Sequence, residues 1–575
     1  MARSATNTGN NVLKYSPSFL KALVFFLVTL VFFIPVVRLI ILSFNSENGL
    51  NLDHYYEVLH NPVTWKTIYN TFIIVTGATL ISVVLGLLTA WIVAYTNIKH
   101  KKLLQVFIFL PFVIPSYITT LAWTQFMGIN GPIAKIVNIL PGNLEPINLY
   151  SLTGIILVMG LSHYPLVYLL TVGVLRKIPR ELVMAANVSG SSKFTSFRKV
   201  TLPLALPGIA SGGLLAFLAS LDNFGIPAFL GIPANIRVLS TYIYEQIIGF
   251  GPSAFAKGAT LSVILGFIAI IGTLIQWLFL RRSKQFETSR EDKEPRVILS
   301  KKRRLIIEGV LWIFLIVTSI VPLLSMASTS LIRAYGLDFT LQNLSFKHYE
   351  FILFSSSKAQ DAIQNSLQLA LVVTFIGLFV GTFIAYIRVR RPSLFNKTIE
   401  VIIGIPYALP GTVLALAMIF TWLEPIPGWN PGIYGSVLIL YIAYFTRFLI
   451  LQIRGSVTSL LQIDVSMEDA ARTSGATPYH KWRKILIPLI LPGLLSGAFL
   501  VFLTSLTELT VSSLLWSSGS ETIGLVIYNF EQAGYTTNST AFSTIIVLLI
   551  LIGFSVIYVL QKLWERKVLQ NGYRD

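Results

Sequence analysis

Two stretches of the chain repeat one another: ELVMAANVSGSSKFTSFRKVTLPLALPGI at residues 181–209 and MEDAARTSGATPYHKWRKILIPLILPGL at residues 467–494. Small residues and prolines recur between them at a constant spacing of 285 residues. The matched pairs are Gly190 and Gly475, Pro203 and Pro488, Pro207 and Pro492, Gly208 and Gly493, Ser211 and Ser496, and Gly212 and Gly497. Chance does not keep one spacing over so many positions, so the stretches indicate an internal duplication.

A second set of matches extends the duplication toward the N-terminal side of each stretch. LPFVIP at residues 110–115 aligns with IPYALP at residues 405–410 at a spacing of 295 residues. The same spacing joins Asn70 to Asn365, Gly86 to Gly381, and Ala90 to Ala385. The chain therefore consists of two related halves.

The composition places both halves in a membrane. Of the 575 residues, 54% are hydrophobic and 12% are charged, whereas about a quarter of the residues of a soluble domain are charged. The apolar residues gather into blocks of about 20 or more, the length of helix that crosses a bilayer. The absence of cysteine excludes disulfides, thiolate metal sites and cysteine nucleophiles.

Apolar blocks long enough to span a bilayer occur six times in each half. They run approximately over residues 19–44, 66–96, 103–127, 150–175, 202–222 and 255–280, and over 305–333, 362–387, 398–423, 433–453, 486–507 and 541–561. Because each half has an even number of spans, the halves share one orientation and are related by an axis along the membrane normal. We predict an all-α polytopic membrane protein with 12 transmembrane helices in two parallel six-helix repeats, and a pathway between them.

Charge fixes the expected orientation and the organisation of the chain. Most of the 44 Lys and Arg residues lie in the two tails and in every second loop. Basic residues near helix ends stay on the cytoplasmic side of the membrane. We therefore expect a protein of the inner or plasma membrane with both termini in the cytoplasm. The predicted parts are an N-terminal tail (1–18), a first half (19–281), a basic linker (282–304), a second half (305–562) and a C-terminal tail (563–575). We interpret the linker as a solvated connection rather than a regulatory segment.

Polar residues at the ends of spans are candidates for lining the pathway. Asp222 and Asn223 close the fifth span, and Thr507 and Glu508 close the eleventh. The two carboxylates either attract a cation, which prefers oxygen ligands when it is hard, or only cap their helices. Arg447 in the tenth span opposes a bare cation and suits an anion or a chelated metal, and the sequence leaves this conflict open.

Four prolines interrupt the third and ninth spans: Pro111, Pro115, Pro406 and Pro410. Lipid offers no partner for the backbone groups that a proline frees, so these residues should face protein or a wet cavity. A gate and a simple packing kink are equal alternatives for them.

The duplicated stretches form the loop after the fourth span of each half. Paired alanines, followed four residues later by glycine, predict a short helix. Its small side chains leave one face flat, and the helix ends at a residue able to adopt positive φ. Such a helix fits a groove on another protein. The downstream Pro203 and Pro488 are expected in the first turn of the next span, where a missing N–H costs little.

This pattern of Glu-Ala-Ala, three residues, Gly, and then hydrophobic-Leu-Pro resembles the coupling loop in membrane subunits of type I binding-protein-dependent ABC importers. In that family the short helix docks in a cleft of the ATPase subunit and transmits its closure. The resemblance assigns this role to Ala185, Ala186 and Gly190 in a loop at about 180–200, and to Asp469, Ala470, Ala471 and Gly475 in a loop at about 465–485. The family's Glu is replaced by Met184 in the first loop and by Asp469 in the second, so the first is expected to make weaker polar contacts.

Two such loops in one chain resemble the fused permeases of the ferric-iron type. Residues 222–247, DNFGIPAFLGIPANIRVLSTYIYEQI, are similar to an outer loop of iron permeases, and related sequences are assigned to 2-aminoethylphosphonate. The resemblance implies import of iron(III), with 2-aminoethylphosphonate, thiamine or a polyamine as alternatives. It implies as partners two ATPase subunits that hold ATP and Mg, an extracytoplasmic substrate-binding protein and membrane lipid, but no nucleic acid.

The chain offers no catalytic motif of its own. It contains no G-x-x-x-x-G-K-[ST] phosphate loop, and its six histidines form no H-E-x-x-H motif. We expect no catalytic residue, no metal site and no cofactor, with ATP hydrolysis on a separate subunit. The rival class is a gradient-driven transporter with 6+6 parallel repeats, and a channel is more distant. The duplicated loop after the fourth span of each half favours the importer.

Overall fold

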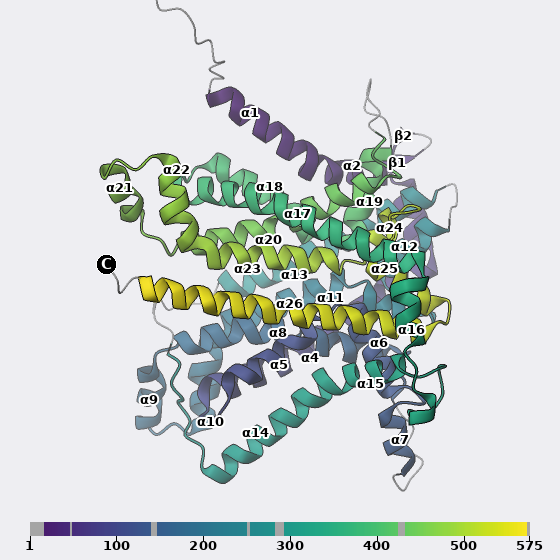
Figure 1. Cartoon of the computed structure of the whole chain (residues 1–575), viewed down its shortest axis with the longest axis horizontal. Helices are drawn as coiled ribbons and strands as arrows, with labels where there is room; N and C mark the ends of the chain where they lie inside the picture. Colours follow the sequence, from purple (N-terminus) through teal and green to yellow (C-terminus); the bar gives the residue numbers. More distant parts are fainter. Residues whose placement is uncertain are drawn as a thin grey trace, which may run out of the picture.

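The computed structural model describes residues 17–46, 49–139, 147–249, 253–281, 292–423 and 432–571. Most of these residues are helical, and the strands described are the antiparallel pair β1 (Asn45–Ser46) and β2 (Gly49–Leu50). The long helices run roughly alongside one another, with short helices at both ends of the bundle (Figure 1). The predicted all-α class is confirmed.

The elements follow the duplication. Long helices of the first half are α1 (Pro17–Val28), α2 (Ile34–Phe44), α4 (Pro62–Tyr95), α5 (Lys101–Val113), α6 (Ser116–Met127), α8 (Leu152–Lys177), α11 (Leu202–Asp222) and α13 (Ala254–Arg281). Those of the second half are α14 (Lys301–Leu315), α15 (Val321–Ser330), α17 (Ser357–Arg390), α18 (Leu394–Ala408), α19 (Gly411–Leu423), α20 (Val437–Leu460), α23 (Ile487–Leu506) and α26 (Thr536–Asn571). Short helices are α3 (Asp53–His60), α7 (Pro132–Ile139), α9 (Arg180–Val188), α10 (Lys193–Ser196), α12 (Leu239–Ile248), α16 (Lys347–Glu350), α21 (Val465–Thr473), α22 (Pro478–Lys481), α24 (Ser512–Leu515) and α25 (Ile523–Gln532). Single π turns are η1 (Thr29–Phe33), η2 (Phe197–Thr201), η3 (Pro227–Gly231), η4 (Ile316–Ile320), η6 (Phe351–Ser355) and η7 (Trp482–Leu486), and η5 (Leu341–Asn343) is a 3₁₀ turn.

Ten helical rods among the described residues are long and apolar enough to cross a bilayer, and two broken pairs bring the number to twelve. The broken pairs are the third and ninth predicted spans, 103–127 and 398–423, in which the sequence places interrupting prolines. They bend by 101° after α5 and by 109° after α18. Ile114 and Leu409 are extended at the two breaks, because the ring of the following Pro115 or Pro410 disfavours helical backbone before it.

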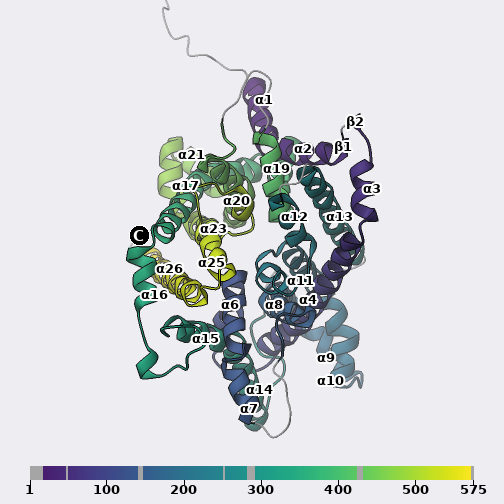
Figure 2. The same cartoon turned by 90° about the vertical axis from the view of Figure 1, so that its right-hand side faces the viewer.

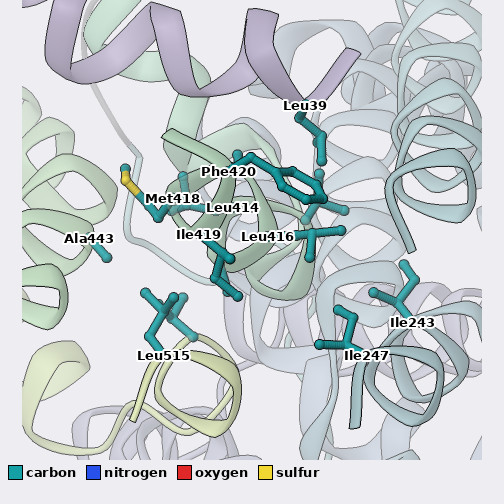
Figure 3. Packing of buried hydrophobic residues seen from close by; sticks show 14 of the residues in the cluster. Leu39, Ile243, Ile247, Leu414, Leu416, Met418, Ile419, Phe420, Ala443 and Leu515 are labelled. Carbon is teal, nitrogen blue, oxygen red and sulfur yellow. The ribbon is translucent and has the colours of Figure 1, made fainter. Parts of the chain in front are cut away.

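The helices after the two breaks are buried on all sides. Residues 117–126 of α6 and 411–422 of α19 are buried in the bundle. Figure 3 shows the packing around α19, where Ile419 and its neighbours lie among Leu39 of α2, Ile243 of α12, Ala443 of α20 and Leu515 of α24. Helix α19 is apolar on nearly every face, as expected of a helix in a core, and this core joins the two halves.

The first span of each half packs against the other half. Helix α2 contacts α19, and α15 contacts α6, so each first span covers the broken span of its counterpart (Figure 2). No pattern in the sequence indicates this exchange, because equal halves are compatible with separate packing. The exchange makes the two halves one structural unit.

Four spans contain a π turn that ends two residues before a proline. Turns η1, η2, η4 and η7 precede Pro35, Pro203, Pro322 and Pro488. Widening the helix by one residue accommodates a ring that cannot donate to the preceding turn. Contrary to the expectation that Pro203 and Pro488 open new spans, the helical rods begin earlier, at Lys193 and Pro478.

The duplicated glycines of α4 and α17 mark close helix crossings. A Cβ on Gly86 would lie 2.5 Å from the Cβ of Val167 and 2.9 Å from the carbonyl oxygen of Tyr164. A Cβ on Gly381 would lie 2.8 Å from Cγ of Gln452. A larger residue at either position would push α4 from α8 or α17 from α20.

Candidate coupling loops and substrate pathway

The two predicted coupling helices, α9 and α21, lie at the same end of the bundle. They stand with α10 and α22 at the left of Figure 1, the end of the bundle where α26 also ends. Each helix is nine residues long. Two equivalent short helices at one end of two parallel halves present a pair of similar surfaces.

Both helices end in the same glycine-dependent cap. Gly190 has φ +85° and Gly475 has φ +78°. The N–H of Ser191 donates to the carbonyl of Ala186, and the N–H of Ala476 donates to that of Ala471, each at 3.0 Å. A Cβ at either glycine would meet no atom of the described residues within 4 Å, so the backbone conformation, not lack of space, demands glycine.

The other predicted coupling residues differ in exposure. Ala185 and Ala470 are exposed, whereas Ala186 is half-buried and Ala471 is buried. Asp469 is exposed, and its carboxylate lies 3.3 Å from Nη1 of Arg472. The loops also expose large apolar side chains, namely Met184, Val188, Phe194, Met467 and Tyr479. Both loops therefore present accessible side chains to a partner.

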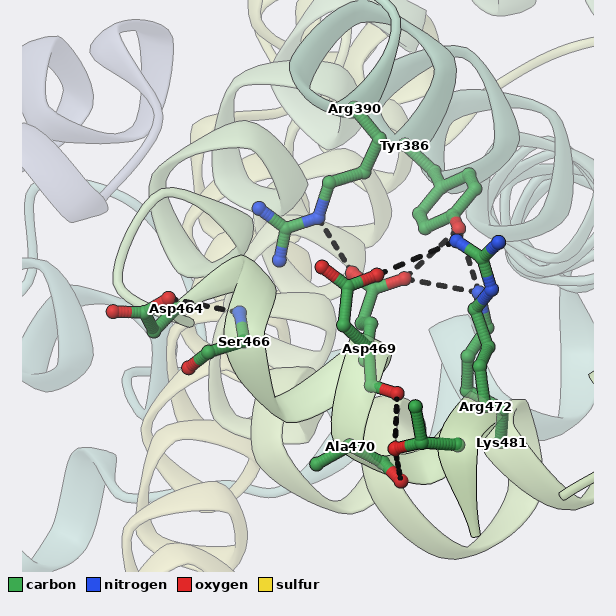
Figure 4. A network of polar contacts seen from close by, with 10 residues as sticks. Tyr386, Arg390, Asp464, Ser466, Asp469, Ala470, Arg472 and Lys481 are labelled. Atoms are coloured by element: carbon green, nitrogen blue, oxygen red, sulfur yellow. Dashed lines mark hydrogen bonds and ion pairs between the residues drawn. The ribbon is translucent and has the colours of Figure 1, made fainter. Parts of the chain in front are cut away.

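The acid that anchors α21 is Glu468, next to the motif residue. Its carboxylate accepts a 2.6 Å bond from Nε of Arg390 and a 2.9 Å bond from Nζ of Lys481 (Figure 4). The hydroxyl of Tyr386 donates to the same carboxylate at 3.0 Å. Burial alone would raise the pKa of the Glu468 carboxyl, but the bonds from Lys481, Arg390 and Tyr386 outweigh it and lower the pKa. Glu468 therefore stays ionised and ties α21 to the end of α17.

Sequence reasoning missed this anchor, although a signal was available. The resemblance drew attention to Asp469, and the acid one residue earlier was passed over. Arg390 lies in the last turn of α17, on the side of the membrane where the coupling loops are expected, and is therefore a candidate partner for an acid in the loop. The missing information was which basic side chain reaches the loop.

Asp222 connects the two halves. Its carboxylate accepts a 2.7 Å bond from Nη2 of Arg447 in α20 and a 2.6 Å bond from the N–H of Gly411, the first residue of α19. The side chain of Arg447 is 8% exposed and that of Asp222 is 36% exposed. A carboxylate at a helix N-terminus and against a guanidinium is doubly favoured.

The other three predicted pathway residues make local contacts. Glu508 accepts bonds from the N–H groups of Val511 at 2.7 Å and Ser512 at 3.0 Å. Asn223 accepts a bond from the N–H of Ile226, and the hydroxyl of Thr507 donates to its own helix. No group of three or more His, Cys, Asp or Glu side chains that could hold a metal occurs among the described residues.

The four prolines occupy the broken spans. Pro111 and Pro406 are buried inside α5 and α18, and Pro115 and Pro410 lie at the breaks themselves. The break at Pro410 exposes the N–H of Gly411 that Asp222 binds. Pro410 and Asp222, which the sequence analysis treats as separate candidates, thus take part in one contact.

A second intramembrane arginine, Arg38 of α2, was also missed. Its Nη1 donates to the carbonyls of Phe420 at 3.1 Å and Thr421 at 3.2 Å, near the end of α19. Helix ends leave carbonyls without intrahelical partners, and a membrane interior supplies none. A lone arginine in an apolar block is the available signal for such a role.

Comparison with known proteins matches this architecture to a family. Residues 82–285 and 377–570 each match the family described as "Binding-protein-dependent transport system inner membrane component". The chain belongs to this family. The two matches fall one in each half, so the permease carries the family unit twice. It is a multi-pass membrane subunit of an importer, and the gradient-driven alternative receives no support.

Curated relatives align with both halves of the permease. It is 24% identical to the ferric transport system permease protein FbpB of Actinobacillus pleuropneumoniae over 92% of this chain and 76% of that protein. It is 23% identical to the Fe(3+)-transport system permease protein FbpB 2 of Haemophilus influenzae over 92% of this chain and 96% of that protein. The maltodextrin transport system permease protein MdxF of Bacillus subtilis is 26% identical but covers 40% of this chain.

Proposed function

We propose that this permease forms the membrane pathway of an ATP-driven importer of iron(III). The observation that carries the proposal is the pair of α9 and α21 caps at one end of a fused permease whose ferric-transport relatives align over 92% of the chain. Sugar permeases match a smaller part of it. The end with α9 and α21 faces the cytoplasm, and both termini lie on that side.

Two ATPase subunits dock on the coupling loops, one at α9–α10 and one at α21–α22. Glu468 supports this role because it connects α21 to α17 through Arg390 and to the rod that begins at α22 through Lys481. A force applied to α21 therefore reaches two long helices of the second half. ATP and Mg are held by the ATPase subunits, so the permease contributes movement and no catalytic group.

The contact between Asp222 and the Arg447–Gly411 pair closes the pathway between the halves. It joins the end of α11 to α19 and α20, so outward opening has to separate these groups. Once released, the Asp222 carboxylate presents oxygen ligands to a hard cation such as iron(III). An extracytoplasmic substrate-binding protein delivers the ion at the end opposite α9 and α21.

A phosphonate is the second candidate substrate, and one observation favours it. Among the described residues, Nη1 of the buried Arg447 has no hydrogen-bond partner. A guanidinium suits a phosphonate better than a metal cation. 2-Aminoethylphosphonate therefore remains the alternative substrate, with the same coupling loops.

The test combines docking with substrate-dependent ATP hydrolysis. Wild type, Gly190→Arg and Gly475→Arg would be co-purified with the cognate ATPase, and hydrolysis measured with iron-loaded or phosphonate-loaded binding protein. Gly534→Arg is the matched control, because Gly534 has φ +79°, open space and the same type of cap at the end of α25. Helix α25 lies at the opposite end of the bundle (Figure 1).

We expect the ATPase to stay with wild type and Gly534→Arg and to be lost from the two coupling-loop variants. Stimulation of ATP hydrolysis by the iron-loaded binding protein supports iron(III) as the substrate. Stimulation only by the phosphonate-loaded protein would contradict iron(III) and identify the phosphonate as the substrate. ATPase retention by both Gly190→Arg and Gly475→Arg contradicts the docking role.

A further inference from the structure

The described part of the linker lies against the first coupling loop instead of standing free in solvent. The N–H of Asp292 donates to the carbonyl of Arg176 at 2.9 Å, at the end of α8. The N–H groups of Arg296 and Val297 both donate to the carbonyl of Tyr95 at 2.8 Å, at the end of α4. The linker thus bridges the end of α4 and the end of α8, the helix that leads into α9.

Arg296 is the buried centre of this contact. Its side chain is 6% exposed. Nη1 donates to the hydroxyl of Tyr95 at 2.8 Å, the guanidinium lies 4.5 Å from the centre of the Tyr95 ring, and Nη2 donates to the carbonyl of Ile178. Ile178 stands two residues before α9 begins, so Arg296 holds the entry to the first coupling helix.

The internal repeat gives this contact a counterpart in the second half. Ile178 and Ile463 are equivalent at the spacing of 285 residues, and Tyr95 and Arg390 are equivalent at 295. Nη2 of Arg390 donates to the carbonyl of Ile463 at 3.0 Å. An arginine therefore binds the same carbonyl before each coupling helix, from α17 in the second half and from the linker in the first.

The acid that anchors the coupling helix also comes from a different element in each half. Val183 of α9 occupies the position of Glu468, so the first coupling helix lacks the anchoring acid. Instead, Nη2 of Arg180 in α9 donates to the carboxylate of Asp292 at 3.0 Å and lies 3.1 Å from that of Glu294. The hydrogen bond from Arg180 lowers the pKa of the Asp292 carboxyl, so the pair is charged at neutral pH. In one half the acid is on the coupling helix, and in the other it is on the linker.

We infer that residues 292–299 of the linker are the support of the first coupling helix, with Arg296 as a positioning residue that replaces the missing equivalent of Arg390. This inference concerns the geometry of α9 and holds for any substrate. Only its consequence for ATP-driven transport rests on the proposed function.

The absence of cysteine from the chain allows a direct measurement of helix mobility. A nitroxide attached at Val188→Cys reports on α9, and one at the equivalent Thr473→Cys reports on α21. Each label would be recorded by electron paramagnetic resonance in the full chain, combined with Arg296→Ala, Arg390→Ala or the control Arg303→Ala. Arg303 is an exposed arginine in the first turn of α14, at the end of the linker and outside residues 292–299.

We expect Arg296→Ala to raise the mobile fraction of the label on α9 about tenfold, as loss of a charged hydrogen bond predicts, and to leave α21 unchanged. Arg390→Ala should do the reverse, and Arg303→Ala should affect neither label. Arg180→Gln tests the support from the other side and should also loosen only α9. Equal effects on both labels, or an immobile α9 in both Arg296→Ala and Arg180→Gln, overturn the inference. ATPase docking is not needed for this measurement, so its failure is distinct from failure of the importer proposal.

Discussion

At the scale of single residues, the coupling-loop glycines are set by backbone conformation. Because Gly475 has φ +78° with open space around it, Gly475→Ala should destabilise the cap by roughly 1 kcal/mol, whereas asparagine tolerates this region better. We predict that Gly475→Ala lowers substrate-stimulated ATP hydrolysis of the assembled importer more than Gly475→Asn does. A larger loss with the bulkier asparagine would show instead that side-chain size at the docking surface decides.

The second prediction at this scale concerns the charge of Glu468. The buried carboxylate accepts hydrogen bonds from Arg390 and Lys481. At neutral pH, Glu468→Gln should therefore lower the free energy of unfolding by about 2 kcal/mol. Its folded-state pKa lies below the ordinary value of 4.5, so the contribution is complete above that value and is lost as the pH falls through the folded pKa. Thermal unfolding of wild type and Glu468→Gln should differ at neutral pH and converge in acid. A difference independent of pH would mean that the charge is not responsible.

At the scale of elements, α19 depends on a partner from the other half. Arg38 binds the carbonyls of Phe420 and Thr421, and Arg38→Met would leave these carbonyls in apolar surroundings at a cost of about 2 kcal/mol. We predict a lower melting temperature for Arg38→Met in detergent, with Arg38→Lys intermediate because it keeps a donor. Val63→Met, an exposed change in α4, is the control. Equal melting of Arg38→Met and the control would contradict the capping role.

The elements also show where sequence reasoning stops. Spans, duplication and the glycine caps were predictable, because hydropathy, spacing and positive φ are local properties. The positions of the breaks at Pro115 and Pro410 could be predicted, because a proline disrupts a helix. Their bend angles of more than 100° could not, because a proline alone does not determine the size of a bend. The contacts of Asp222 with Arg447 and of Arg296 with Ile178 join residues far apart in sequence, and neither side chain has a local feature that selects its partner.

At the scale of the whole molecule, the two halves are joined by apolar packing and by the linker as well as by the Asp222 contact. The first spans are exchanged, the core around α19 is shared, and the linker lies against the first coupling loop. Two of these connections involve α19 or its neighbours, so the broken span of the second half lies where relative motion of the halves is most constrained. The arrangement predicts that opening is controlled by the few polar contacts that close α19 against the first half.

The ion pair of Asp222 and Arg447 is the contact that tests this control. Asp222→Asn leaves the buried Arg447 without its anion at a cost of about 3 kcal/mol, and it weakens the link to Gly411. We predict that Asp222→Asn raises ATP hydrolysis in the absence of binding protein, because the closed pathway is no longer favoured. The double variant Asp222→Asn with Arg447→Gln should recover stability, since no buried charge is left unpaired, yet keep the elevated basal hydrolysis. Thermal unfolding and basal hydrolysis of the single and double variants separate the two effects. If basal hydrolysis returns to the wild-type level together with stability, the pair serves only folding, and the closed pathway must be held by the apolar core around α19.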